Sequence, residues 1–258
     1  MSATGADVLV GWERGSFTAA GYTRETYRRG TGPAVIVVHE IPGITPKVAL
    51  FANDVVEAGF TVVMPSLAGT PGRDVSGPYM AASSIKVCIS KEFTHWALNQ
   101  TSPIIGWLRA LARSLHLELG GPGVGAIGMC FSGGFALGMM VDDVMVAPVL
   151  SQPSLPMAVG RERGADLNLS ADDRLTIAQR AADGCEVLGL RFTGDKLVGT
   201  RFESLRVLLG DAFIAVELPS NSPKDHSVLT EQRDEPSVAK VIDFLHSKLH
   251  TATPTLDV

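Results

Sequence analysis

The chain has 258 residues, of which 45% are hydrophobic and 19% are charged, and its formal net charge is −5 at pH 7. This length fits a single α/β domain over residues 1–258, and the lack of a lysine- or arginine-rich run argues against nucleic-acid binding. No apolar run approaches a membrane span, and three separated cysteines make no disulfide framework, so we expect a cytoplasmic protein that binds neither nucleic acid nor membrane.

The N-terminal part contains short alternating pieces around Gly15, which predict a β-hairpin over residues 8–28. After it, apolar runs alternate with segments of helical spacing. The predicted strands cover residues 34–38, 60–64, 124–127, 144–149, 186–192 and 213–218. The predicted helices cover residues 46–58, 94–118, 170–182 (with Ser170 as N-cap), 200–209 and 236–249. This alternation predicts an α/β fold in which helices cover both faces of a mainly parallel sheet.

Three segments interrupt the alternation. Residues 65–92 are rich in glycine, proline and serine. Because a long irregular segment in a compact domain is usually functional, we expect a lid or pocket wall at about residues 65–95. Residues 154–169 are polar and irregular, and residues 251–258 are expected to form a loose tail.

The most informative motif follows the strand at 124–127 and reads Gly128-Met129-Cys130-Phe131-Ser132-Gly133-Gly134. It predicts a nucleophile elbow, a sharp strand-to-helix turn with Cys130 at its apex. Such a turn needs small residues two positions before and after the apex, and Gly128 and Ser132 meet this need. Two alternatives stay open, a buried structural cysteine and Ser132 as the nucleophile. A phosphate-binding loop is excluded because no lysine follows the glycines.

Other polar side chains gather at the same predicted edge of the sheet. Ligands of open α/β sheets bind beyond the carboxyl ends of the strands. Glu40, Cys130, Asp195 and His226 all lie at or just after predicted strand ends. This convergence predicts an active site there.

A thiol that attacks a carbonyl carbon needs a base, a group that orients the base, and donors for the oxyanion. His226 is the expected base, and Asp195 is expected to hold its imidazole in one tautomer. Asp225 is a poor orienter because adjacent side chains diverge. The expected oxyanion donors are the backbone N–H groups of Ile41 and Phe131, and the helix after the elbow is expected to favour a thiolate.

Several further candidates are assigned structural roles. His39 is expected to face away from the pocket and to serve packing or hydrogen bonding. Cys88 and Cys185 lack a glycine elbow and are expected to be structural thiols. His246 and His250 lie one helical turn apart, as zinc ligands can, but no carboxylate accompanies them and histidines suit a helix C-terminus. We therefore expect no metal site.

Four segments together resemble the dienelactone hydrolase family. They are His39-Glu40-Ile41-Pro42-Gly43, Gly128-Met129-Cys130-Phe131-Ser132-Gly133-Gly134, Gly194-Asp195 and Asp225-His226-Ser227. The resemblance covers roughly residues 8–250, and the order nucleophile, acid, histidine is that of the α/β-hydrolases. It implies an α/β-hydrolase fold and hydrolysis of an ester or lactone through an acyl-thiol intermediate, without metal or cofactor.

The resemblance also assigns roles to residues. By position, Cys130 is the nucleophile, His226 the base and Asp195 its orienter. Glu40 corresponds to the acid that contacts the resting thiol and helps to generate the thiolate when substrate enters.

The chain departs from the family's pattern in two places. The family's elbow has glycine two residues after the cysteine, where this chain has Ser132. Members that cleave dienelactone bind the substrate carboxylate with arginines after the second core strand and shortly after the histidine. The nearest arginines here are Arg73 and Arg233, of which Arg73 is the candidate for substrate binding.

The sequence leaves the function open between three hypotheses. The first is a hydrolase of small carboxylic esters or lactones, with a small molecule as its only expected partner. The others are an acyltransferase and a non-catalytic ligand-binding or redox-sensing protein on the same scaffold. The sequence does not decide between a monomer and a homodimer.

Overall fold

The apolar runs of the sequence form an eight-stranded sheet in the computed structural model, which describes residues 7–93 and 97–250. The strands are β1 Glu13–Ala19, β2 Tyr22–Arg29, β3 Ala34–Val38, β4 Thr61–Pro65, β5 Val124–Met129, β6 Met145–Ser151, β7 Val187–Phe192 and β8 Phe213–Leu218. The helices are α1 Pro46–Glu57, α2 Gly77–Ile89, α3 Pro103–Leu119, α4 Phe135–Met139, α5 Arg161–Ala165, α6 Ala171–Ala182, α7 Arg201–Leu209 and α8 Glu235–Leu249. Short 3₁₀ turns are η1 Asp7–Leu9, η2 Lys91–Phe93, η3 Cys130–Ser132 and η4 Gly210–Ala212.

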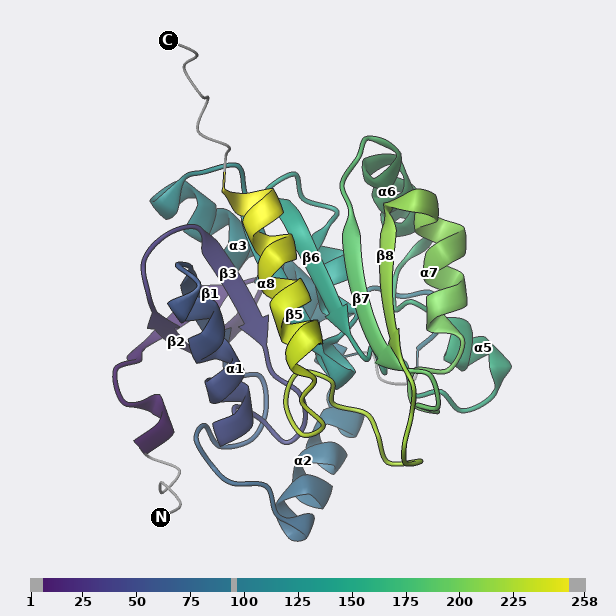
Figure 1. Cartoon of the computed structure of the whole chain (residues 1–258), viewed down its shortest axis with the longest axis horizontal. Helices are drawn as coiled ribbons and strands as arrows, with labels where there is room; N and C mark the ends of the chain where they lie inside the picture. The colour runs from purple at the N-terminus through teal and green to yellow at the C-terminus, as the bar shows by residue number, and fades with distance from the viewer. Residues whose placement is uncertain (1–6, 94–96, 251–258) are drawn as a thin grey trace.

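The strands lie in the order β1-β2-β4-β3-β5-β6-β7-β8. All pairs from β4 to β8 are parallel, whereas β1 pairs with β2 and β2 with β4 in antiparallel fashion. The predicted mainly parallel α/β sheet is therefore confirmed. The parallel strands all end at one edge, and α2 lies beyond that edge (Figure 1).

Alternate side chains of each core strand enter different layers. In β3, Val35 and Val37 pack in the layer covered by α1 and α8, while Ile36 and Val38 pack in the layer covered by α3 and α4. Figure 1 shows α1 and α8 side by side on one face of the sheet. All five residues of β3 are buried. A strand buried on both faces explains why this run has no polar residue.

The N-terminal hairpin exists, but its turn is not near Gly15. Gly15 lies within β1, opposite Thr26 of β2. The chain reverses at Ala20 and Gly21, which have φ angles of 48° and 80°. Two central residues with positive φ are typical of a two-residue β-hairpin turn, because the twist of such a turn matches the right-handed twist of the two strands that it joins.

The prediction that residues 65–92 are irregular is wrong for α2. This helix begins after Ser76, carries a proline in its first turn and buries Tyr79, Ser83 and Val87. These three residues are four positions apart, so they form one face that packs on the domain. Tertiary burial outweighs the weak helix propensity of the glycine and serines.

Other boundaries also differ from the predictions. The long helix begins at Pro103 rather than at residue 94, and residues 94–96 lie outside the described residues. The segment 154–169 contains the short helix α5. Ser170 caps α6 as predicted, because its side chain accepts a hydrogen bond from the backbone N–H of Asp173. The expected tail, 251–258, also lies outside the described residues.

Within residues 7–93 and 97–250, no helix is long and apolar enough to cross a membrane.

Candidate active site

The turn after β5 has the strained geometry expected of a nucleophile elbow. Cys130 has a φ angle of 55°, a left-handed conformation that residues with a side chain rarely adopt. A Cβ atom added to Gly128 would lie 2.1 Å from the backbone oxygen of Ser132, so the close approach of the two chain segments requires glycine there. The turn presents the Cys130 side chain at the carboxyl edge of the sheet.

The Ser132 hydroxyl bonds to the backbone of the elbow and is not placed to act as the nucleophile. It is fully buried. Its hydroxyl accepts a hydrogen bond from the backbone N–H of Met129 at 3.0 Å and lies 3.0 Å from the carbonyl oxygens of Val38 and His39. These contacts tie the elbow to the end of β3. The Ser132 hydroxyl is thus hydrogen-bonded to backbone groups, and Ser132 does not line the cavity described below.

The helix that follows the elbow is shorter than the sequence suggests. The chain forms the 3₁₀ turn η3 and then the five-residue helix α4. Gly133 separates them and packs so closely that an added Cβ would lie 2.6 Å from Pro153. The backbone N–H of Phe131 begins this turn, where N–H groups lack the carbonyl partners of a helix interior. Such N–H groups are the local source of positive potential beside the thiol.

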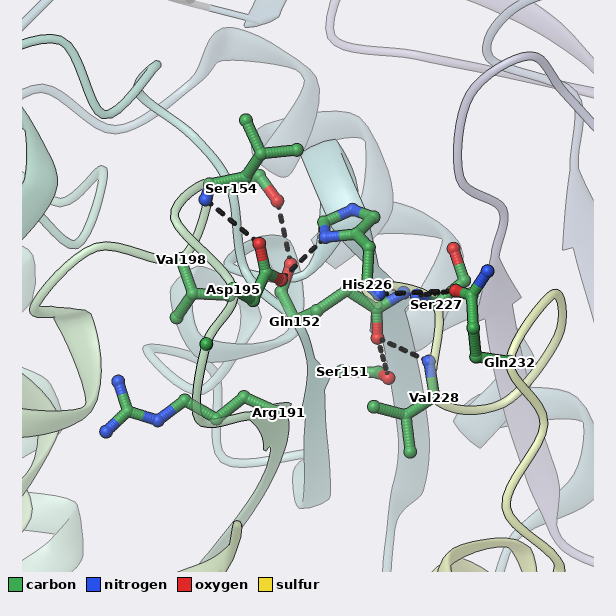
Figure 2. A network of polar contacts seen from close by, with 12 residues as sticks. Ser151, Gln152, Ser154, Arg191, Asp195, Val198, His226, Ser227, Val228 and Gln232 are labelled. Carbon is green, nitrogen blue, oxygen red and sulfur yellow. Dashed lines mark hydrogen bonds and ion pairs between the residues drawn. The ribbon is translucent and has the colours of Figure 1, made fainter. Parts of the chain in front are cut away.

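Asp195 and His226 form the predicted acid–histidine pair. Nδ1 of His226 lies 2.6 Å from Oδ2 of Asp195 (Figure 2). The other carboxylate oxygen accepts the backbone N–H of Leu197 at 2.9 Å. Asp195 is buried and follows β7. Since Nδ1 donates its hydrogen to the carboxylate, the imidazole is held in the tautomer whose Nε2 is free to accept a proton.

The second nitrogen of His226 is buried and unpaired. Nε2 has no hydrogen-bond partner among the described residues. Burial lowers the pKa of His226, but the charge of Cys130 and the hydrogen bond that His226 donates to Asp195 outweigh it and raise that pKa to about 11. The surroundings of His226 therefore favour a proton on its imidazole.

Two glutamine side chains that the sequence pattern does not predict hold the loop that carries His226. Oε1 of Gln232 accepts the backbone N–H groups of His226 at 3.2 Å and Ser227 at 2.9 Å (Figure 2). Oε1 of Gln152, which follows β6, accepts the backbone N–H of Val228 at 3.4 Å. Asp225 instead accepts backbone N–H groups within its own loop, which agrees with its exclusion as the orienter.

Glu40 is buried, 4% exposed, and lies at the centre of a polar cluster. Its carboxylate accepts hydrogen bonds from the hydroxyls of Ser227 at 2.7 Å and Thr230, and from the Gln152 amide at 3.2 Å. Burial raises the pKa of Glu40, while the two hydroxyls lower it. These partners join the end of β3 to the His226 loop. The contact of Glu40 with the resting thiol stays a prediction.

The loop that carries Asp195 is held by Arg201, another residue that the sequence analysis had not singled out. Arg201 is 1% exposed, and burial lowers its pKa to about 10. Its guanidinium donates to the backbone carbonyls of Leu155, Pro156, Arg163, Asp166, Leu197 and Val198. One buried cation thereby joins three chain segments, including Leu197 and Val198 shortly after Asp195.

A cavity of about 230 Å³ opens at this site. Cys130, His226 and Glu40 line it together with Ile41, whose backbone N–H is one of the predicted oxyanion donors. Its outer wall is formed by Val75, Met80 and Ser84, from α2 and the residue stretch before it. These three positions lie within residues 65–95, where a lid or pocket wall is predicted.

Arg73 lies outside the residues that line this cavity. Its guanidinium lies 4.3 Å from the ring centroid of Tyr79. The Tyr79 hydroxyl in turn accepts the backbone N–H of Thr70 at 2.6 Å. Arg233 forms ion pairs with Asp54 and Glu235. A role of Arg73 in substrate binding stays a prediction.

His39 serves the structural role predicted for it. It is fully buried, and burial lowers its pKa to about 4. Its Nδ1 hydrogen-bonds to the backbone carbonyl of Glu40, and its Nε2 accepts the backbone N–H groups of Leu67 and Ala68. The described residues contain no cluster of three or more metal-ligating side chains; the rings of His246 and His250 stack near Phe60 instead.

Comparison with known proteins agrees with this architecture. A sequence profile of the dienelactone hydrolase family matches residues 19–152. The fold is similar to a dienelactone hydrolase-like promiscuous phosphotriesterase from metagenomic libraries, at 14% identity and a TM-score of 0.62 over 93% of this chain and 98% of that one. It is also similar to a cold-adapted esterase from an Arctic intertidal metagenomic library, at 15% identity and a TM-score of 0.58 over 93% and 94% of the chains.

A third similar structure is the thioesterase domain of the curacin biosynthetic pathway, at 10% identity and a TM-score of 0.55 over 92% of this chain and 99% of that one. A search of curated proteins found no match. At these identities the structural likeness shows the fold, which is that of the α/β-hydrolases.

Proposed function

The chain belongs to the dienelactone hydrolase family and is a carboxylic ester hydrolase, and on this premise we propose that it cleaves small esters or lactones through an acyl-thioester on Cys130. The observation that carries the proposal is the orientation of the His226 ring between Asp195 and the cavity. Its Nδ1 is fixed by Asp195 at 2.6 Å, while its unpaired Nε2 is buried beside the cavity that Cys130 also lines.

The first half of the reaction forms the acyl-enzyme. His226 holds the proton of the Cys130 thiol at Nε2, and the sulfur attacks the carbonyl carbon of the bound ester. The carbonyl electrons move to the oxygen, and the C–O bond to the alcohol breaks when they return. The leaving alkoxide takes the proton from Nε2, so that an alcohol and an acyl-Cys130 thioester remain.

The second half regenerates the thiol. Neutral His226 takes a proton from a water molecule, and the resulting hydroxide attacks the thioester carbonyl. The carboxylic acid leaves, and the sulfur departs as a thiolate paired with the imidazolium. Asp195 stays ionised throughout and stabilises each imidazolium form.

The charge that develops on the carbonyl oxygen needs fixed donors. The backbone N–H groups of Phe131 and Ile41 are suited to this role because one begins the turn after Cys130 and the other follows β3. Ser132 hydrogen-bonds both to the elbow and to the end of β3, so it fixes these two segments relative to each other. Removing one such donor typically costs about 10²–10³ in kcat.

The test is the hydrolysis of a short-chain aryl ester by wild type and cysteine variants. Cys130→Ala is expected to lose several orders of magnitude in kcat, and Cys130→Ser to keep partial activity because hydroxyl and thiol share the same geometry. Cys88→Ala and Cys185→Ala are the matched controls, since each removes a cysteine that forms no disulfide and lies outside the cavity lining. Mass spectrometry should find the acyl group on the peptide that contains Cys130. Full activity of Cys130→Ala would overturn the proposal.

A further inference from the structure

The cavity around Cys130 offers acidic groups but no free basic group. Its lining includes the carboxylates of Glu40 and Glu231, and among the described residues it includes no lysine or arginine. Its remaining side chains, such as Val75, Met80 and Leu197, are apolar or uncharged. A substrate carboxylate placed here would lose its hydration without gaining a cationic partner, which is costly.

His226 can carry a positive charge, but its neighbours already neutralise it. The carboxylate of Asp195 lies 2.6 Å from Nδ1, and the charge of Cys130 contributes to holding the proton on the ring. With one proton shared between the imidazole and the sulfur, and with Asp195 ionised, the three groups together carry a net charge of −1, whichever of the two holds the proton. The catalytic residues therefore add to the negative potential of the cavity.

Two basic side chains close in space or in sequence to cavity-lining residues contact other side chains. The ammonium of Lys47, at the start of α1, forms an ion pair with Glu231, and both side chains lie at the protein surface. The Arg73 guanidinium lies over the ring of Tyr79. Neither residue lines the cavity.

We propose that this site selects esters and lactones that carry no free carboxylate and that it discriminates against anionic substrates. This inference rests on the proposed hydrolase function. The cavity volume of about 230 Å³ adds a limit on size, since it lies below the roughly 300–1,000 Å³ of sites for drug-sized ligands. The substrate class is thus a small, neutral ester or lactone.

The test compares esters that differ only in charge. One pair carries the difference on the acyl side, 4-nitrophenyl glutaramate with a terminal carboxamide and 4-nitrophenyl glutarate with a carboxylate of the same size. A second pair carries it on the alcohol side, 4-carbamoylphenyl acetate and 4-carboxyphenyl acetate. We expect kcat/KM to be at least about tenfold higher for the neutral member of each pair at low salt, with a smaller ratio at high salt.

Charge variants at the mouth of the cavity sharpen the test. Glu231→Gln leaves the Lys47 ammonium without its partner and should narrow the neutral-to-anionic ratio about threefold, the effect of one surface charge. Lys47→Gln should widen the ratio by a similar factor. Glu118→Gln removes a surface glutamate of the Arg28 ion pair and should leave the ratio unchanged. If Arg73→Gln lowers kcat/KM for the anionic esters only, Arg73 binds the carboxylate and the inference is overturned.

Failure of the inference can be told apart from failure of the proposed function. Equal or faster cleavage of the anionic esters, still dependent on Cys130, overturns the selectivity alone. If wild type cleaves none of the four esters, the hydrolase proposal fails for these substrates. Calorimetric binding of each pair to Cys130→Ala then measures the selectivity without turnover. Tighter binding of the neutral member supports the inference, and equal or tighter binding of the carboxylate overturns it.

Discussion

His39 should make the stability of this protein depend on pH in a way that one substitution removes. The imidazole is fully buried between the end of β3 and the loop at Leu67. Its Nε2 accepts backbone N–H groups from Leu67 at 3.0 Å and Ala68 at 3.3 Å. A proton on Nε2 would place a donor against two donors, so the folded state strongly prefers the neutral ring.

The size of the effect follows from the shift in pKa. Burial lowers the pKa of His39 from 6.5 to about 4. The unfolded chain therefore binds more protons than the folded one between these values, and stability falls as the pH drops from 6.5 towards 4. The full shift corresponds to about 3 kcal/mol, and about 2 kcal/mol of it is lost between pH 8 and pH 5.

Urea denaturation at pH 8 and pH 5 measures this loss in wild type and in His39→Gln. The glutamine can still accept the N–H of Leu67 but does not titrate. Other titrating groups, including His226, contribute to both proteins and cancel in the comparison. We expect the free energy of unfolding to fall by about 2 kcal/mol more in wild type than in the variant. Equal pH dependence in the two proteins would refute the reasoning.

Three further predictions follow from the site. Asp195→Asn should reduce kcat by about 10³–10⁴ with the fold intact, because the amide stabilises the wrong tautomer of His226; ester hydrolysis and circular dichroism check both parts. Arg201→Met should lower the free energy of unfolding by more than about 3 kcal/mol in a urea titration, because several buried carbonyls lose their hydrogen-bond donor. Arg206→Met on the same helix is the control. Its side chain is 44% exposed, and the change should lower the free energy of unfolding by less than about 1 kcal/mol. Gly128→Ala should abolish esterase activity because its Cβ would lie 2.1 Å from the Ser132 carbonyl oxygen, and wild-type kcat in this variant would contradict the elbow geometry.

Residues whose role depends on local geometry were predictable from the sequence. The elbow at Cys130 is encoded by its own small neighbours, and the strand Ala34–Val38 by its β-branched run. The sheet edge that joins Cys130, Asp195 and His226 follows from strand–helix alternation, because parallel strands end on the same side.

Residues whose role depends on distant partners were not predictable. Arg201 appears in the sequence as an ordinary helix residue, and its burial follows only from the folding of three loops around it. Gln152 and Gln232 accept hydrogen bonds from backbone N–H groups of the His226 loop. A sequence motif does not indicate such contacts with the backbone. The helix α2 was missed because its buried face, and not its composition, stabilises it.

The hydrogen bonds of Glu40 have a consequence for the order of events during synthesis. Its hydroxyl partners, Ser227 and Thr230, lie 187 and 190 residues further along the chain. The base His226 belongs to the same late segment. A ribosome that has completed β3, the elbow and most of the sheet has therefore made the proposed nucleophile without its proposed base, and the Glu40 carboxylate without its two hydroxyl donors. If Cys130 is the nucleophile, as proposed, we expect the site to become reactive only when the last loop and α8 dock.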